Sequence, residues 1–483
     1  KSHNSICFQI GRKRFGQFVL IKHVGCGTTT QKIAALRVKA EQEFEKLSLG
    51  QQLPLLPQAP KPAGKALLLS LKITGYHRVF GAVYDRIGFP KGLLRDLTIA
   101  RIAHPASKSS TVRYLNCYLG LTLTKDSVFR FLDTLDKDGL TKTAFNFVAT
   151  KNRGLTLIFY DVTTLSFETE KEDGLRQKGY SKDHRHDLPQ ILVGLLVDRD
   201  GYPLDFDFFT GKTFEGHTFQ VAITNLLSKY SLKNLTVVAD AGMLSSDNLD
   251  FLERSNLHFI VGARLKNLTA GITAEILSHD FGKGNPFSLD LKNRRILVSY
   301  SSDRARKDRH LRENLVAKLT KRLEAQVPVI KKSKYLKWMG GGGNGLSLDE
   351  AKAAADAKFD GLKGYLTSVD LKDCPAEEVI RHYHDLWQVE RSFRMSKSDL
   401  CERPIFHRLE KRIKSHLTIC FVSLLVLRET ERILKTGGYS LSLALELLGK
   451  VVEGRVRIGK VELSTESDLD LSTKSLLELF EGH

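Results

Sequence analysis

The hydrophobic pattern of the chain changes its period near Leu155. Before it, residues 64–150 carry apolar side chains at helical spacing, and after it short apolar runs alternate with amphipathic segments. The runs predict five strands, LTLIFYD, QILVGLLVD, PLDFDFF, LTVVAD and HFIVGAR, with helices after the third and the fourth. The predicted order is therefore β-β-β-α-β-α-β. Strands that are apolar on both faces are typical of the centre of an α/β sheet.

The later part of the chain has less regular patterns. Residues 266–372 contain a strand-like run, NRRILVSYS, a basic helical stretch from Asp303 to Glu324 and a glycine-rich loop from Gly340 to Gly345. The run GYLTSVDL predicts a strand that leads back to the core, and the chain after Pro375 is predicted to be helical. Its last part, residues 436–483, is predicted to form a helical tail.

Charge adds a class of partner to this picture. The 483 residues include 74 Lys and Arg against 55 Asp and Glu, a formal net charge of +19, and 42% of them are apolar. The length fits about two to four domains with a real core. The basic excess favours a polyanion such as nucleic acid, because Lys and Arg displace counterions from phosphates. The alternative is a basic surface that has no such partner.

The N-terminal residues predict a basic hairpin (FQIGRKRFGQFVLIKHV), a helix (TTTQKIAALRVKAEQEFEKL) and a proline-rich linker (QQLPLLPQAPKPAG). Further along, STVRYLNCYLG and TKDSVFRFLDTLDK predict two helices joined by a turn near Gly120. This pair fits a helix-turn-helix whose second helix enters a major groove of DNA. It fits equally a helical hairpin that only packs.

The cysteines and the longest apolar run exclude several classes. No two of the six cysteines have C-x-x-C spacing, so neither a zinc site nor a redox motif is indicated, and free, reduced thiols are expected. The run from Leu417 to Leu427 is too short to span a bilayer and predicts a buried helix. With no signal peptide visible, we expect a cytoplasmic protein without a membrane partner.

Two acidic residues stand at the ends of apolar strands. Asp161 ends the first predicted strand and Asp240 ends the fourth. If these strands are parallel neighbours, both carboxylates project from one edge of the sheet, where α/β proteins place their sites. Two carboxylates there repel each other unless cations lie between them, and Mg²⁺ prefers such oxygen ligands. The alternative for each Asp is a turn or a helix cap.

A third carboxylate lies on a patterned helix. Tyr383, Glu390 and Lys397 are seven residues apart, which is close to two helical turns. All three therefore share one face, each about 10 Å from the next. A phenol, a carboxylate and an amine in one row suit a metal site flanked by phosphate contacts. The alternative is a solvated face with ordinary ion pairs.

Four blocks of sequence, in this order, resemble the DDE transposases of bacterial insertion sequences. They are LIFYDVTTLSFE, GYSKDHRHDLPQILVGLLVDRDGYPL, VVADAGMLSSDNLDFL and YHDLWQVERSFRMSKSDLCERPIFH. The resemblance is to the group with a Tyr-Arg-Glu-Lys signature around its catalytic Glu. It runs from about Gly81 to Leu427, with weaker similarity in residues 30–60.

The resemblance implies a ribonuclease-H-like core in which Asp161, Asp240 and Glu390 bind the catalytic metals. The long interval between Asp240 and Glu390 fits a branch with a β-rich insertion. Tyr383 and Lys397 fall on the Tyr and Lys of the signature.

The signature Arg has no match, because Leu386 occupies its position. The phosphate contact that it implies is therefore assigned to Arg391 or Arg394, on a neighbouring turn.

The implied chemistry needs two divalent ions, Mg²⁺ or Mn²⁺, about 4 Å apart. Asp161 is assigned to both ions, Asp240 to one and Glu390 to the other. The first cut frees a 3′-hydroxyl, which attacks across the duplex to form a hairpin or directly on target DNA, and the resemblance favours cut-and-paste with a hairpin. The alternatives are a DNA-binding protein that has lost catalysis and a host nuclease with the same core.

Further DNA contacts are expected outside the three carboxylates. The basic helix offers Arg304, Arg306, Lys307 and Arg309, and the loop RQKGYSKDHRH offers Lys178, Lys182 and Arg185. His184 and His186 in that loop are read as part of a basic loop beside DNA rather than as metal ligands. Trp338 is a candidate for stacking on a flipped base, with ordinary packing as the alternative.

The expected molecule is an α/β protein with a ribonuclease-H-like catalytic core, a β-rich insertion and a mainly helical N-terminal DNA-binding region. We divide it into a region for DNA-end binding and dimerisation (1–150), the first part of the core (151–265), the insertion (266–372), closing core helices with Glu390 (373–435) and a helical C-terminal tail (436–483). Its expected partners are the terminal inverted repeats and target DNA, bound by a homodimer, in the bacterial cytoplasm at the nucleoid.

Overall fold

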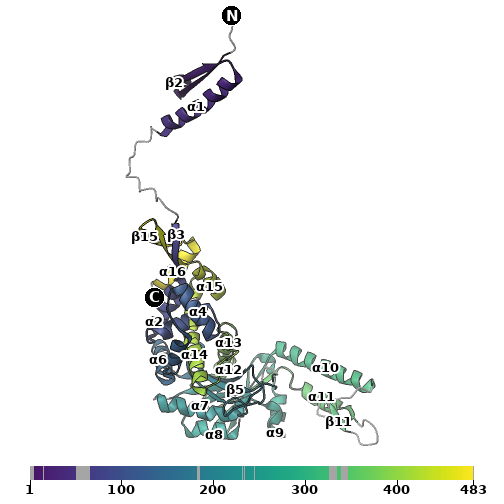
Figure 1. The fold of residues 1–483 in the computed structure, drawn as a ribbon. Coiled ribbons are helices and arrows are strands. Elements are labelled where there is room, and N and C mark those ends of the chain that lie inside the picture. The colour runs from purple at the N-terminus through teal and green to yellow at the C-terminus, as the bar shows by residue number, and fades with distance from the viewer. Residues whose placement is uncertain are drawn as a thin grey trace. The chain divides into compact units, whose positions relative to one another are not determined.

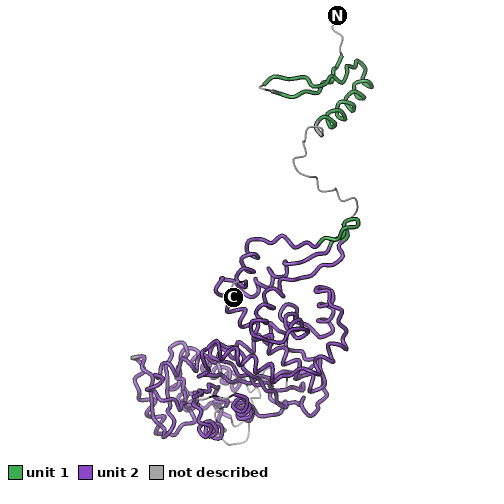
Figure 2. The backbone as a smooth tube through the Cα atoms, turned by 90° about the vertical axis from the view of Figure 1, so that its left-hand side faces the viewer, with its two compact units in different colours: residues 1–67, 456–463 green, residues 68–455, 464–483 purple. Residues whose placement is uncertain are grey.

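The computed structural model forms two compact units (Figure 2), unit 1 with Lys1–Leu67 and Val456–Leu463 and unit 2 with Leu68–Arg455 and Ser464–His483. The structure describes residues 5–14, 16–49, 66–181, 185, 187–230, 232, 234–243, 245–325, 334–338 and 346–481. The proline-rich linker, the glycine-rich loop and the residues Lys182, His184 and His186 lie outside this part of the chain.

Unit 1 contains a long hairpin and one helix. Strands β1 (Ile6–Arg14) and β2 (Gln17–Gly27) pair antiparallel, and α1 (Thr30–Leu49) follows them (Figure 1). Both predicted elements are confirmed. The basic residues of this hairpin lie on strands that are largely exposed.

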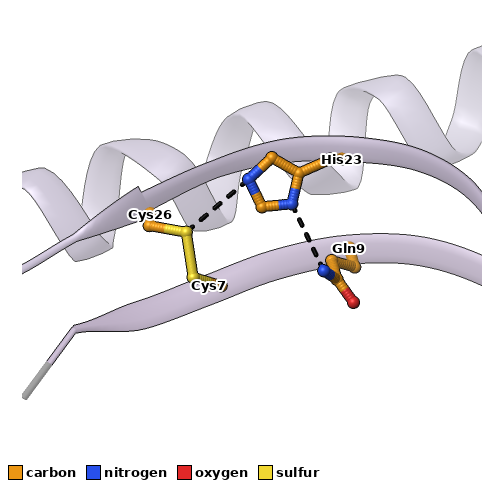
Figure 3. The surroundings of a disulfide bond; sticks show 4 residues. All are labelled: Cys7, Gln9, His23 and Cys26. Atoms are coloured by element: carbon orange, nitrogen blue, oxygen red, sulfur yellow. Dashed lines mark hydrogen bonds between the residues drawn. A yellow bond between two sulfur atoms is a disulfide. The ribbon is translucent and has the colours of Figure 1, made fainter.

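The hairpin also corrects the prediction that all cysteines are free thiols. Cys7 and Cys26 are register partners and form a disulfide, with His23 3.6 Å from the Cys26 sulfur (Figure 3). A search for C-x-x-C spacing misses such a pair, because hairpin register brings together residues that are far apart in sequence. The free cysteines are Cys117, Cys374, Cys401 and Cys420.

Unit 2 is organised around an eight-stranded sheet in the order β6-β5-β4-β7-β8-β13-β10-β9. Its strands are β4 (Leu157–Ser166), β5 (Gln190–Asp198), β6 (Pro203–Thr210), β7 (Thr236–Ala239), β8 (His258–Ala263), β9 (Phe287–Leu291), β10 (Arg294–Tyr300) and β13 (Leu362–Thr367). The β4–β7 and β7–β8 pairs are parallel and the others are antiparallel. With α7 (Glu215–Lys229) and α8 (Ser246–Arg254), the predicted β-β-β-α-β-α-β order is confirmed.

The helical part of unit 2 packs around one buried helix, α14 (Glu410–Thr436). This helix contacts α2 (Gly75–Ile87), α3 (Leu93–Ala103) and α6 (Lys137–Lys151), and it reaches β6 of the sheet. The apolar run in α14 is a buried helix, as predicted. Within the described ranges, no helix is long and apolar enough to cross a membrane.

Helices α4 (Lys108–Leu119) and α5 (Lys125–Leu132) form the predicted helical pair. Gly120 ends α4 with φ 69°, a left-handed conformation that glycine adopts without strain. A capping box at Thr124 and Ser127 then begins α5. The turn near Gly120 is confirmed. That the second helix, α5, enters a major groove of DNA stays a prediction.

The predicted helical tail is wrong. Helices α15 (Leu441–Gly449) and α16 (Leu471–Glu481) flank two strands, β14 (Val452–Ile458) and β15 (Val461–Glu466). These strands belong to a sheet of order β15-β14-β3, where β3 is Ala66–Ile73. Apolar and polar residues alternate along RVRI, a period of two that indicates a strand rather than a helix.

The segment predicted as a β-rich insertion is mixed rather than β-rich. Its strands β9, β10 and β13 extend the main sheet beyond β8, and β11 (Leu336–Trp338) pairs with β12 (Leu346–Leu348). Its helices are α9 (Ala270–Ser278), α10 (Ser302–Glu324) and α11 (Glu350–Ala357). The predicted basic helix is thus confirmed as α10, the longest element of the segment.

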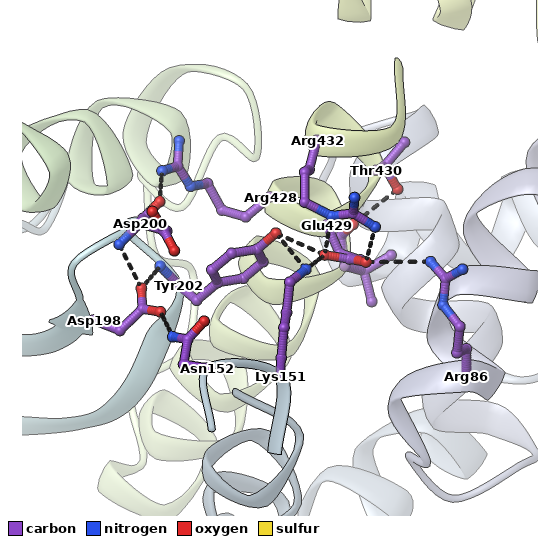
Figure 4. A network of polar contacts seen from close by, with 11 residues as sticks. Arg86, Lys151, Asn152, Asp198, Asp200, Tyr202, Arg428, Glu429, Thr430 and Arg432 are labelled. Carbon is purple, nitrogen blue, oxygen red and sulfur yellow. Dashed lines mark hydrogen bonds and ion pairs between the residues drawn. The ribbon is translucent and has the colours of Figure 1, made fainter. Parts of the chain in front are cut away.

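A buried carboxylate, Glu429 on α14, ties the helices to the sheet (Figure 4). It accepts hydrogen bonds from the Tyr202 hydroxyl (2.6 Å) and the Arg432 guanidinium (2.8 Å), and it forms ion pairs with Lys151 and Arg86. Burial alone would raise the pKa of Glu429, but the hydrogen bonds from Arg432, Lys151 and Tyr202 outweigh it and hold this pKa at about 2. Glu429 is therefore charged and fully compensated.

Candidate active site

The two aspartates are brought together by the register of two parallel strands. The last partners of the β4–β7 ladder are Tyr160 and Ala239, so Asp161 and Asp240 are the next residues on adjacent strands. The prediction that these two strands are parallel neighbours is confirmed. One detail of the prediction is wrong, because Asp161 lies in the middle of β4, which continues to Ser166 along β5.

Asp240 is held by neutral donors. Its Oδ1 accepts a hydrogen bond from the Ala241 backbone N–H at 2.7 Å and another from the Tyr383 hydroxyl at 3.0 Å. Burial and the neighbouring Asp240 carboxylate raise the pKa of Tyr383, so the phenol stays protonated and keeps donating. Tyr383 therefore orients Asp240 without neutralising its charge.

Glu390 lies on a second helix beside the same strand. The structure breaks the predicted single helix into α12 (Ala376–His384), which carries Tyr383, and α13 (Trp387–Ser398), which carries Glu390 and Lys397. Asp385 and Leu386 lie between the two helices. Helix α13 packs on β4 and β5, and Glu390 is exposed in its first turn.

The break explains the missing signature Arg. Leu386 is 8% exposed and belongs to the main hydrophobic core, a position where a guanidinium would need a buried partner. Of the two suggested replacements, Arg391 forms an ion pair with both oxygens of Glu431 (2.8 and 2.9 Å). Arg394 is exposed, and no ion pair joins it to another residue that the structure describes.

The donors at this edge fit hard divalent cations. Asp161 and Asp240 supply carboxylate oxygens from adjacent strands, which are the ligands that Mg²⁺ and Mn²⁺ prefer. Across the described part of the chain, no group of three or more His, Cys, Asp or Glu side chains lies close enough to hold one ion. The structure thus has the two aspartates on adjacent strands and Glu390 on α13, which packs on β4. The three side chains do not form a cluster in this structure.

Two cationic side chains, Lys363 and Arg304, lie near Tyr383 and Asp240. The sequence analysis predicted only Arg304. The Lys363 ammonium on β13 lies 4.9 Å from the centre of the Tyr383 ring. Burial and the nearby Arg304 of α10 lower the pKa of Lys363, while Asp240 opposes them. Arg304 was predicted as a DNA contact, whereas Lys363 was missed. The feature that could have indicated Lys363 is a lysine inside an otherwise apolar strand.

Aromatic and histidine side chains support Tyr383 from behind. The Tyr365 ring lies 5.1 Å from the Tyr383 ring, and its hydroxyl contacts His384 Nε2 (3.2 Å) and Ser299 Oγ (3.1 Å). Burial and Lys363 lower the pKa of His384, which favours the neutral imidazole. This packing fixes the direction of the Tyr383 hydroxyl.

A cavity of about 420 Å³ opens beside Lys363, between α10, α11 and β13. Five basic side chains line it, together with the carboxylates of Asp308, Asp356 and Asp360: Lys266, Arg304, Arg312, Lys334 and Lys363. Arg312 pairs with Asp360, and both Lys266 and Lys334 pair with Asp356. Two members of this group also interact electrostatically with the aspartate site: Lys363 with Asp240, and Arg304 with Tyr383.

The remaining predicted DNA contacts lie apart from the carboxylates. On α10, Arg306 pairs with Asp303, and Lys307 and Arg309 are exposed. In the loop between β4 and β5, Arg185 pairs with Glu168 (2.9 Å) and Lys178 is exposed. Trp338 ends β11, but its side chain, like Lys182, lies outside the part that the structure describes.

Comparison with known proteins gives a family. Residues 152–426 match the model of the Transposase DDE domain family. No curated protein matches the chain. Among solved structures, it is similar to the piggyBac transposase synaptic complex with hairpin DNA, at 10% identity over 78% of this chain and 76% of that one, with a TM-score of 0.38.

Two further similarities are weaker. The Mos1 transposase paired-end complex with left transposon end matches at 12% identity, over 46% of this chain and 66% of that one, with a TM-score of 0.17. The Mos1 mariner paired end complex with Mn matches at 12% identity, over 46% and 67%, with a TM-score of 0.16. Because the family match covers more than half of the residues, the chain belongs to the DDE transposases, enzymes that cleave DNA and transfer its strands.

Proposed function

We propose that the protein moves an insertion sequence by cutting DNA at the ends of the element and joining them to a target. The site would use Asp161, Asp240 and Glu390 with two divalent metal ions. The observation that carries the proposal is the β4–β7 register, which makes Asp161 and Asp240 the next residues after the last partners of two adjacent parallel strands. The strand order of β4 to β8 supports a ribonuclease-H-like core.

Each side chain has a role in this proposal. Asp161 and Asp240 would hold the ions, and Tyr383 orients Asp240 through its hydroxyl. Bound Mg²⁺ or Mn²⁺ would supply charge neutralisation on the scissile phosphate and a more acidic water. Lys363 would add positive charge beside the same phosphate. Glu390 would complete the ligand set from α13, and its exposed position leaves its side chain room to reorient.

The finer parts of the proposal concern DNA and assembly. Residues 1–150 would bind the terminal inverted repeats, and a homodimer would pair two ends at the nucleoid. The freed 3′-hydroxyl would attack the opposite strand and leave a hairpin. The basic side chains of α10 would bind the DNA next to the cleavage site. Arg304 is the main candidate, because it lines the same cavity as Lys363.

A cleavage assay tests the catalytic assignment. The substrate is a plasmid that carries the coding sequence with its natural flanking DNA, incubated with Mg²⁺ or Mn²⁺. We expect the wild type to release the element, and Asp161→Asn, Asp240→Asn and Glu390→Gln to bind the same DNA without cutting it. Denaturing gels then show whether the released ends are hairpins. Cleavage that survives Glu390→Gln would remove Glu390 from the site.

A further inference from the structure

A second cavity, of about 330 Å³, lies in unit 2 where α3, α4 and the start of α14 meet the segment after α13. We name it the α4 pocket. Two arginines, one lysine and two histidines from four separate segments line it: Arg101, Lys108, Arg403, His407 and His416. The proposed catalytic chemistry uses none of these side chains.

Lys108 is the unusual member of the lining. It is 7% exposed, and no hydrogen bond or ion pair joins its ammonium to any residue that the structure describes. Burial and the neighbouring Arg101 lower the pKa of Lys108 to about 7. A pKa near 7 leaves the Lys108 amine about half protonated at neutral pH, and an anion that entered the pocket would favour its charged form.

Lys137 shows what a buried lysine without a ligand looks like in the same protein. It is also 7% exposed, but its ammonium lies 3.1 Å from Asp207 and 3.6 Å from Asp205. Those carboxylates compensate its charge from within the fold. The contrast indicates that the partner of Lys108 comes from outside the chain.

The surroundings of Lys108 also favour an anion. Arg101 is 4% exposed and donates one long hydrogen bond, 3.4 Å, to the Leu400 carbonyl. The buried Glu402 accepts from Ser396 Oγ at 2.7 Å, and burial raises the pKa of this carboxyl. Burial and Lys108 lower the pKa of His407 to about 4, so this imidazole is neutral. Positive charge therefore exceeds negative charge inside the pocket.

The backbone adds a further attraction for anions. Lys108 is the first residue of α4, a helix of twelve residues whose N-cap is Ser107. The N–H groups of a first helical turn and the helix dipole favour negative charge at this position. An anion in the α4 pocket would thus meet the helix terminus and the Lys108 ammonium together.

We propose that the α4 pocket binds a phosphate group of the DNA backbone. This inference rests on the proposed function, because it takes the substrate DNA as the ligand. The location supports DNA over a free anion. Arg403 lines both the α4 pocket and an adjoining cavity with Arg185 and Ser166, and Ser166 ends β4, the strand that carries Asp161. The pocket would hold the DNA at a distance from the cut and fix its direction.

The test measures how tightly the full-length protein binds a duplex of arbitrary sequence, without divalent metal, over a series of salt concentrations. We expect Lys108→Met to weaken binding and to reduce the slope of log affinity against log salt by about 1, the value for one lost phosphate contact. Lys108→Arg, which keeps the charge, should restore the slope. An unchanged slope in Lys108→Met would overturn the proposal.

Lys137→Met is the matched control, because it removes an equally buried lysine. It should lower the melting temperature, since Asp205 and Asp207 lose their cation, and it should leave the salt slope unchanged. Lys108→Met should melt at the wild-type temperature or above it. An equal change of slope in both variants would mean that the loss of a buried lysine acts through the fold, and would contradict the proposal.

Inorganic phosphate distinguishes the two sources of the ligand. If phosphate raises the melting temperature of the wild type but not of Lys108→Met, while duplex binding is the same for both, the pocket takes free anions and the DNA proposal fails. These measurements do not depend on catalysis. A protein that binds the duplex through Lys108 but never cuts it would contradict the proposed function alone.

Discussion

Two carboxylates of unit 2, Glu429 and Asp240, have hydrogen-bond partners that differ in charge. Glu429 is enclosed by Lys151, Arg86 and Arg432 and by the Tyr202 hydroxyl. At the sheet edge, Asp240 accepts from a backbone N–H and a phenol, and no ion pair joins it to a cation in the described part of the chain. Cations from the fold make the first site structural. At the second site the donors are neutral, so the charge of Asp240 has no ion-pair partner among the described residues; in the proposed function a metal ion would neutralise it.

The largest effect is expected when that charge is removed. Asp240→Asn should lower DNA cleavage on the order of 1,000-fold, because it removes metal-dependent stabilisation worth several kcal/mol. Its melting temperature should stay at or above that of the wild type, since like charges no longer repel. Cleavage rates and thermal melts check both parts. A clear drop in melting temperature would show that Asp240 is structural after all.

The opposite result is expected at the enclosed site. Glu429→Gln should reduce the free energy of unfolding by about 3 kcal/mol, because it leaves a group of cations without their shared anion. Duplex cleavage, measured below the melting temperature, should be close to that of the wild type. Urea titration of both proteins gives the difference. If the two proteins unfold at the same urea concentration, the network contributes little to stability.

The Glu429 contribution should also depend on pH. The folded-state pKa of about 2 lies below the ordinary 4.5, so the stabilisation is fully present above pH 4.5 and is lost as the pH falls toward 2. The stability difference between the wild type and Glu429→Gln should therefore be largest near neutral pH and shrink by about 3 kcal/mol at the acid end. A difference that is constant over this range would contradict the assignment of the pKa.

A smaller effect is expected from the neutral donor of the sheet edge. Tyr383→Phe removes the hydrogen bond to Asp240 and should lower cleavage or metal affinity about 10- to 100-fold, the usual range for a group that orients a metal ligand. Cleavage measured against Mn²⁺ concentration separates these effects, because weaker metal binding is overcome at high Mn²⁺. If the loss is unchanged at every concentration, Tyr383 acts on the DNA rather than on the metal.

The smallest effect contrasts two arginines on α13. Arg394→Ala should reduce the salt slope of duplex binding by about 1 and leave stability unchanged, since its side chain is exposed. Arg391→Ala should lower stability and leave the salt slope unchanged, because Glu431 loses its bidentate partner and keeps only Arg428 at 3.4 Å. Duplex binding and urea unfolding of the two variants, side by side, check this. A salt slope that changes in Arg391→Ala and not in Arg394→Ala would exchange their roles.

Local periodicity predicted the helices and strands of the core well. It did not predict the features that depend on pairing between strands far apart in the sequence. The succession of strands and helices from β4 to β8 along the chain follows from apolar runs. The adjacency of Asp161 and Asp240 was expected only if their two strands are parallel neighbours, which the structure shows. The continuation of β4 past Asp161 depends on β5, and the hairpin of β14 and β15 pairs with β3 far away in sequence. Patterns within one segment do not contain these partners.

The site was less predictable than the core for the same reason. The pattern of Tyr383, Glu390 and Lys397 predicted one helix, whereas the structure has two, α12 and α13, with the buried Leu386 between them. Lys363 reaches the site only because β13 returns to pair with β8 after the whole insertion. The Cys7–Cys26 bond likewise depends on hairpin register rather than on spacing.

The pairing of β13 with β8 also has a mechanical consequence. Since β9, β10 and β13 continue the sheet that begins with β6, the segment carrying α10 is clamped to the catalytic strands by ladders of hydrogen bonds on both sides of β13. A pull on α10 would load these ladders in shear. Helix α10 and the strands β4 to β8 would therefore turn together, as one rigid piece.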